Sequence, residues 1–109
     1  MDYRELVVWQ KAMDLVTEIY NITTTFPNEE RFGLSSQARR AAVSIPSNIA
    51  EGHGRKTTGA YLNHISIAYG SLMELETQVQ IAERLKFLPA EKVSAILEKI
   101  SEIARMLSA

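Results

Sequence analysis

Apolar residues recur every three or four positions through most of the chain, the spacing that places side chains on one face of an α-helix. An apolar arc as wide as that of residues 5–25 predicts a helix with neighbours on two sides. The segment from Phe26 to Asn28 is expected to end this helix, because proline disfavours a helical residue before it. The arc consists of two adjacent rows, one of Leu6, Trp9, Met13, Val16 and Tyr20 and one of Val8, Ala12, Leu15, Ile19 and Ile22.

Three further segments show the same period. Residues 33–52 combine an apolar row with many small side chains, and Gly52 and Gly54 are expected to cap the C-terminus in the left-handed conformation. Thr57 is expected to cap a third helix that ends near residues 85–87, in which Gly70 indicates close packing. Pro89 suits the first turn of a fourth helix.

These periods predict the fold. No segment alternates with a period of two for long enough to form a strand, and the connections between the helices are short. Short connections between helices of similar length predict an all-α, antiparallel up-down-up-down four-helix bundle, and 109 residues suit a single domain over 1–109. The chain has no cysteine and no apolar run of about 20 residues, so a reducing, cytoplasmic location is expected.

The second helix keeps a proline in its interior. Pro46 lacks a backbone donor and leaves the carbonyl of Ala42 free, so a kink is expected at Pro46. Nearby polar side chains either bond the bent backbone or build a ligand or subunit contact, and residue chemistry alone favours the first. The bend is expected to present Ser47, Asn48 and Glu51 to a neighbouring helix or subunit.

Three stretches carry a resemblance: LVVWQKAMDLV, FPNEERFGLSSQARRAAVSIPSNIAEGHGR and IAYGSLMELETQVQIA. They resemble a bacterial family of four-helix-bundle proteins that includes those encoded in intervening sequences of 23S rRNA genes. The resemblance covers nearly the whole chain and implies a ring-like homopentamer without enzymatic activity or cofactor. A related accessory protein of diversity-generating retroelements binds nucleic acid and a reverse transcriptase. The sequence motif typical of that family is present in this chain as Gln37, Arg39, Arg40, Ala41, Ser44, Ile45, Pro46, Asn48, Ile49, Ala50, Glu51 and Gly52.

The distribution of charge along the chain is compatible with two functions. The net charge is −1, but residues 31–73 hold five bases and one acid, whereas residues 1–30 hold six acids and two bases. One hypothesis is that the oligomer associates with structured RNA, such as ribosomal RNA, or with a nucleoprotein partner. The other is a protein–protein scaffold without nucleic-acid binding, which the acidic pI of about 6.1 favours. The candidate contacts, to nucleic acid or between subunits, are Arg39, Arg40, Arg55 and Lys56.

The sequence contains no motif typical of a catalytic or metal-binding site. A di-metal bundle needs Glu-x-x-His motifs, and neither His53 nor His64 belongs to one. No phosphate-binding loop or nucleophile elbow is present, so we expect no catalytic residue, metal site or cofactor. Trp9 and Tyr61 are expected in the core or at an interface rather than as stacking platforms for bases.

Overall fold

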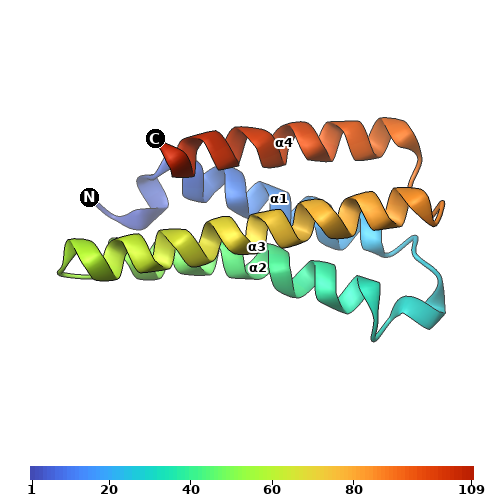
Figure 1. The fold of residues 1–109 in the computed structure, drawn as a ribbon, viewed down its shortest axis with the longest axis horizontal. Helices are drawn as coiled ribbons and strands as arrows, with labels where there is room; N and C mark the ends of the chain where they lie inside the picture. Colours follow the sequence, from blue (N-terminus) through green and yellow to red (C-terminus); the bar gives the residue numbers. More distant parts are fainter.

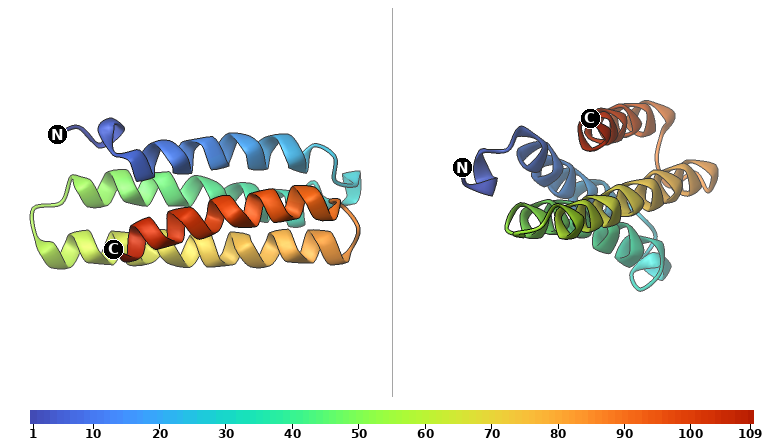
Figure 2. Two further views of the ribbon diagram at one scale, coloured as in Figure 1. Left: turned by 90° about the horizontal axis from the view of Figure 1, so that it is seen from above. Right: turned by 60° about the vertical axis from the view of Figure 1, so that its left-hand side comes forward.

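The computed structural model describes all residues from Met1 to Ala109 and contains helices but no strand. The helices are α1 (Val7–Thr23), α2 (Leu34–His53), α3 (Thr58–Arg84) and α4 (Ala90–Ser108), with short 3-10 turns η1 (Tyr3–Glu5) and η2 (Asn28–Glu30). Successive helices alternate in direction along a molecule of 43 × 25 × 19 Å (Figure 1 and Figure 2). Each helix packs on the next, and α4 packs on α1, which confirms the predicted four-helix bundle. None of the helices is both long and apolar enough to cross a membrane.

One of the two apolar rows of the first helix lies in the core, and the other lies at its margin. Ala12, Leu15 and Ile19 are fully buried, whereas Met13 and Tyr20 of the other row are exposed. Leu6, Trp9 and Val16 of this second row are partly buried against the core, and the row follows the edge between α1 and α2. The helix also begins later than predicted, because Asp2 caps the separate turn η1 by accepting a hydrogen bond from the N–H of Arg4.

The second helix runs without interruption through Pro46, whose side chain is buried. In Figure 1 the N-terminal half of α2 diverges from α3, the change of direction expected of a helix with an interior proline. Two polar side chains bond carbonyls four residues back: Ser47 Oγ donates to Val43 at 2.8 Å and Asn48 Nδ2 to Ser44 at 2.9 Å. Such bonds accompany helix bending and match the first of the two interpretations of this segment.

Three glycines differ from their predicted roles. Gly52 lies inside α2 and is no cap: a Cβ there would lie 3.0 Å from the Cβ of His64, so this glycine permits close approach of α3. Gly54 does end α2, but at φ −82° rather than in the left-handed conformation, so the predicted reason was wrong. Gly70 has no atom within 4 Å of a Cβ position, so the predicted close packing at Gly70 was also wrong.

The ends of α3 are defined by local hydrogen bonds. The predicted cap is confirmed, since Thr57 Oγ1 accepts from the N–H of Ala60 at 3.1 Å. At the other end the N–H of Phe87 donates to Ala82 and that of Lys86 to Glu83, which together form a Schellman motif. Lys86 occupies its left-handed position with φ 64°, where glycine is usual. Helix α4 then begins at Ala90, with Pro89 as its N-cap rather than in its first turn.

Replacing Lys86 with glycine is expected to raise the free energy of unfolding by about 1 kcal/mol, because glycine adopts positive φ without steric cost. Thermal unfolding followed by circular dichroism would show a higher midpoint. Lys92→Gly is the matched control: it removes the same charge inside α4 and should lower stability by about 1 kcal/mol. An unchanged or lower midpoint for Lys86→Gly would show that this turn carries no backbone strain.

Candidate functional site

The signature residues of α2 divide between two faces of the helix. On one face, Gln37, Ser44, Asn48 and Glu51 lie against or beside α3. On the other, Pro46 and Ser47 border α1. Asn48 and Glu51 therefore meet a neighbouring helix as predicted, whereas Ser47 is exposed and bonds its own helix.

A continuous chain of hydrogen bonds joins α2 to α3, and we call it the polar seam (Ser71, Ser44, Asn48, His64 and Arg55). Ser71 Oγ donates to Ser44 Oγ at 2.9 Å, and Asn48 Nδ2 lies 3.1 Å from the same oxygen. Asn48 Oδ1 is 3.0 Å from His64 Nδ1, and Arg55 Nε donates to His64 Nε2 at 3.1 Å. The seam therefore runs from mid-helix to the α2–α3 turn.

Both nitrogens of the His64 imidazole have hydrogen-bond partners. Because Asn48 Nδ2 donates to the carbonyl of Ser44, its Oδ1 faces His64 and accepts a hydrogen bond from Nδ1. His64 Nε2 accepts from Arg55 Nε, and Nδ1 also lies 3.5 Å from Glu51 Oε2. Both ring nitrogens are thereby occupied, and neither contacts a serine hydroxyl. The arrangement orients Arg55 and holds two helices together, and it does not form a nucleophile–base pair.

Beside the polar seam lies a polar hollow of about 380 Å³, lined by Gln37, Arg40, Ala41, Ser44, Ser71 and Glu74. One turn further along α3, the buried Gln78 donates from Nε2 to Glu74 Oε2 at 3.1 Å, while its Oε1 has no hydrogen-bond partner. Sequence reasoning missed Ser71, Glu74 and Gln78. No three acid, histidine or cysteine side chains gather where they could hold a metal ion.

The four basic candidates do not form one patch. Arg39 is engaged within the chain: its Nε donates to Thr23 Oγ1 at 2.8 Å, and its guanidinium lies 4.8 Å from the centre of the Tyr20 ring. A cation there also faces the C-terminal end of α1, where unpaired carbonyls favour positive charge. Arg40, Arg55 and Lys56 are exposed, but Arg40 and Arg55 are separated by roughly 22 Å along the helix axis.

An apolar groove runs between α1 and α2 and has a volume of about 370 Å³. The Tyr3 and Trp9 rings meet edge to face at its end, with centroids 5.3 Å apart. Trp9, Met13 and Val16 of the second apolar row of α1 form one wall, so the periodicity of the sequence identified these residues but not the groove that they line. The groove is lined by Tyr3, Trp9, Met13, Val16, Val43, Pro46, Ser47 and Ala50.

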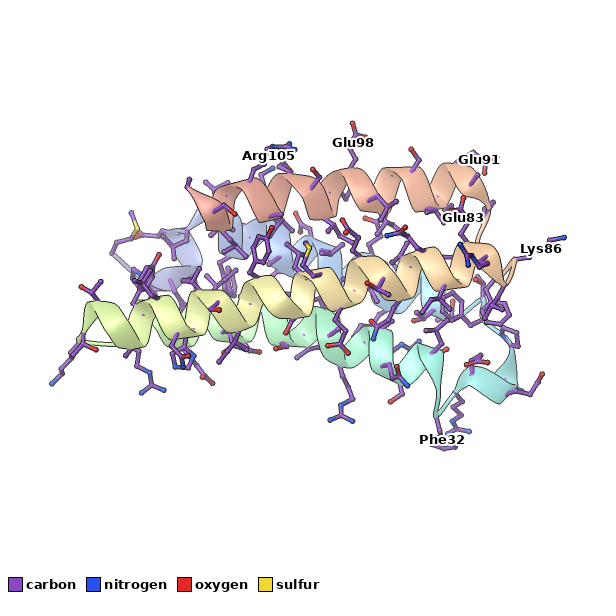
Figure 3. All side chains as sticks on the ribbon, in the orientation of Figure 1. Phe32, Glu83, Lys86, Glu91, Glu98 and Arg105 are labelled. Atoms are coloured by element: carbon purple, nitrogen blue, oxygen red, sulfur yellow. The ribbon has the colours of Figure 1, made fainter.

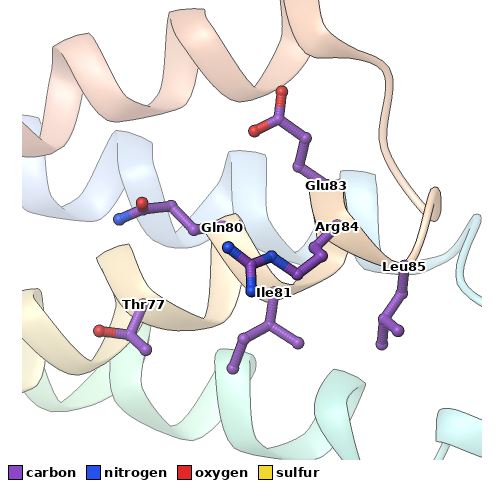
Figure 4. A pocket seen from close by; sticks show the side chains of 6 residues that line it. All are labelled: Thr77, Gln80, Ile81, Glu83, Arg84 and Leu85. Atoms are coloured by element: carbon purple, nitrogen blue, oxygen red, sulfur yellow. The ribbon is translucent and has the colours of Figure 1, made fainter.

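A third surface feature, the α3 hollow, lies at the C-terminal end of α3 and has a volume of about 560 Å³ (Figure 4). Ile81 and Leu85 supply its apolar surface, and both are exposed, since they lie outside the buried apolar row of α3 (Ala68, Leu72, Leu75, Val79 and Ala82). Charged and polar side chains surround them: Thr77, Gln80, Glu83 and Arg84. This hollow was not predicted from the sequence. The only indication of it there was that Ile81 and Leu85 are large apolar residues outside the buried row of α3.

A double-mutant cycle of Asn48→Ala and His64→Ala tests whether the polar seam stabilises the fold. Each single variant should lower the free energy of unfolding by about 1–2 kcal/mol, because it leaves a partly buried partner without its hydrogen bond. The coupling energy should be about 0.5–1.5 kcal/mol in urea unfolding, since the two side chains are in direct contact. Asn63→Ala is the control, because Asn63 is exposed beside His64 on α3. Additive single effects would mean that the seam contributes no pairwise stability.

Comparisons with known proteins agree with this geometry. The family model of the 23S rRNA-intervening sequence protein matches residues 4–109. A crystal structure of a protein of unknown function from the S23 ribosomal protein family of Bacteroides thetaiotaomicron is similar at 26% identity with a TM-score of 0.86. The match covers 93% of this chain and 94% of that one. No curated protein matches the chain. Since the family model spans nearly all of the sequence, the chain belongs to the 23S rRNA-intervening sequence protein family.

Proposed function

We propose that this protein is a non-enzymatic helical bundle that acts as a homo-oligomer. The observation that supports this best is the apolar groove between α1 and α2, where Met13 is 42% and Val43 is 40% exposed. Contiguous apolar surface of this kind marks interaction sites on soluble proteins, because burying it is favourable. A second copy of the chain is the occupant that the family resemblance implies, and five is the number of copies that it implies.

Two further features support a binding role over catalysis. The polar side chains that could act as acid, base or nucleophile in the polar seam bond one another, and His64 has no free nitrogen. The polar hollow and the α3 hollow are both open at the surface. With no cysteine in the chain, a cytoplasmic location remains the simplest proposal.

Light scattering on the purified protein tests the proposal, with an expected mass of five chains. Met13→Glu and Val43→Glu should each shift the mass towards the monomer, because a carboxylate would be buried without a partner in the covered groove. Ser94→Glu is the control and should leave the mass unchanged, since Ser94 is exposed on α4, away from the groove. A monomeric wild-type protein at micromolar concentration would contradict self-association.

Association with structured RNA is a second candidate, supported by three exposed bases with no ion-pair partner, Arg40, Arg55 and Lys56. In a ring these bases would repeat, and their phosphate contacts would add together. Binding measured across a salt series should then show a log–log slope of about −0.7 to −0.9 per phosphate contact. The slope should become shallower in the Arg55→Ala, Lys56→Ala double variant but not in a Lys86→Ala, Lys92→Ala control. Absence of binding at low salt would leave the protein scaffold as the function.

A further inference from the structure

Arg55 is an exposed base whose side chain is bonded to a largely buried partner. Its Nε donates to His64 Nε2 at 3.1 Å, and only 14% of the His64 side chain is exposed. His64 is bonded in turn through Nδ1 to Asn48 Oδ1 at 3.0 Å, and Asn48 Nδ2 to the carbonyl of Ser44. Arg55 therefore lies at the outer end of the polar seam, which ties its guanidinium to both α2 and α3.

The hydrogen bond to His64 leaves the outer edge of the Arg55 guanidinium free. The terminal amino groups at Nη1 and Nη2 have no hydrogen-bond or ion-pair partner in the chain. A guanidinium in this state presents a planar pair of donors, which matches two oxygens of a phosphate or a carboxylate. A lysine at this position would supply the charge but not the paired geometry.

The charges near Arg55 favour an anionic partner with more than one charge. Lys56 follows Arg55 directly in the α2–α3 turn, and no Asp or Glu occurs between residues 52 and 73. Glu51 makes no ion pair with either base and instead lies 3.5 Å from His64 Nδ1. Two adjacent bases suit a polyanion better than a single carboxylate, because each can meet a phosphate of its own.

Acids elsewhere in the chain do not pair with these two bases. At the same end of the bundle, Asp2 and Glu5 make hydrogen bonds within the N-terminal turn. In Figure 3, three further acids lie away from the α2–α3 turn, near the α3–α4 turn or along α4: Glu83, Glu91 and Glu98. The positive charge of the turn is therefore left for a partner.

We propose that His64 is a positioning residue that orients Arg55 to bind two oxygens of an RNA phosphate, an inference that rests on the association with structured RNA proposed above as the second candidate. An exposed arginine loses side-chain freedom when it binds a partner. The hydrogen bond to His64 has already restricted the guanidinium, so less freedom is lost on contact with the phosphate. The polar seam thus couples the packing of α2 on α3 to the geometry of one phosphate contact.

RNA binding across a salt series distinguishes positioning from charge, with a fluorescein-labelled RNA hairpin as the probe. His64→Leu removes the acceptor, so affinity should fall about 3- to 10-fold at every salt concentration with an unchanged log–log slope. Arg55→Ala should make the slope shallower, because it removes a phosphate contact. His53→Leu is the matched control and should change neither, since His53 is bonded to the Met1 carbonyl rather than to Arg55.

Two further variants separate positioning from a purely structural role of His64. His64→Gln retains an acceptor that can reach Arg55, so it should keep most of the affinity that His64→Leu loses. In an Arg55→Lys background, which has the charge but no Nε, His64→Leu should cause no further loss. A purely structural effect would lower affinity equally in both backgrounds. Light scattering and circular dichroism ensure that all variants are compared as folded protein of equal mass.

The orientation of Arg55 can also be measured without RNA. In ¹⁵N-labelled protein, the Nε–H proton of Arg55 should exchange slowly with water, because it is bonded to His64. This protection should disappear in His64→Leu and persist in His53→Leu. Arg40 is the internal comparison, since it is exposed and has no hydrogen-bond partner in the chain.

The outcomes separate the two proposals. A wild-type protein that does not bind the hairpin at low salt overturns RNA association and the role of His64 together. Binding that depends on Arg55 but is unaffected by His64→Leu overturns the role of His64 alone, as does a slope that changes as much in His64→Leu as in Arg55→Ala. A loss of affinity at constant slope, retained in His64→Gln and accompanied by loss of Nε–H protection in His64→Leu only, supports the positioning role.

Discussion

Replacing Leu72 with alanine is expected to lower the free energy of unfolding by about 2–5 kcal/mol. Leu72 lies in the middle of α3, is fully buried, and belongs to the core that all four helices share. Alanine removes the buried methyl groups and leaves a cavity that the surrounding helices can fill only in part. Small domains have a total stability of about 5–15 kcal/mol, so this single change removes a large share of it.

Urea unfolding followed by circular dichroism measures this effect. Leu62→Ala is the matched control, because Leu62 lies on the same helix but is 56% exposed, and its replacement should cost less than about 0.5 kcal/mol. Protein concentration must be equal in all samples, since an oligomer gains apparent stability with concentration. Equal losses for the two variants would mean that Leu72 does not lie in a close-packed core.

Gly52→Val is expected to cost about 1–3 kcal/mol, in spite of the better helix propensity of valine. The added Cβ would lie 3.0 Å from the Cβ of His64 and 3.4 Å from the carbonyl oxygen of Tyr61, and the two γ-methyl groups need further space. Helix α3 would have to move away from α2. Because His64 is part of the polar seam, the same shift should lengthen its bonds to Asn48 and Arg55.

Gly70→Val separates this steric effect from the loss of glycine as such. Gly70 is also inside a helix, but nothing lies within 4 Å of its Cβ position. Stability should therefore stay within about 0.5 kcal/mol of the wild type, with a small gain from helix propensity. Comparison of the two unfolding midpoints gives the result, and a destabilisation shared by both variants would argue against close contact at Gly52.

The candidate surfaces could be predicted only in part. The residues of the family motif predicted a contact surface on α2, and the structure does place Asn48 and Glu51 against α3. Their partner His64 could not be assigned from the sequence, because it lies on another helix and its role depends on the register between the two. The α3 hollow carried no recognised motif, since an exposed apolar residue is conspicuous only when its surroundings are known.

What the sequence determined by itself was local. Helix periodicity depends on residues three and four apart, so the existence of four helices and the cap at Thr57 followed from the chain alone. The short connections then restricted their arrangement to an antiparallel bundle.

Tertiary structure decided which of several locally equivalent residues are buried or bonded. Two apolar rows of α1 have the same spacing, and only packing against α2 and α4 selects the row of Leu15 for the core. Gly52 and Gly70 are both glycines in helices, but only Gly52 meets another helix at close range. Arg39 and Arg40 are adjacent, yet only Arg39 reaches Thr23 on α1. Each outcome depends on distances between helices, and no pattern within a single helix contains those distances.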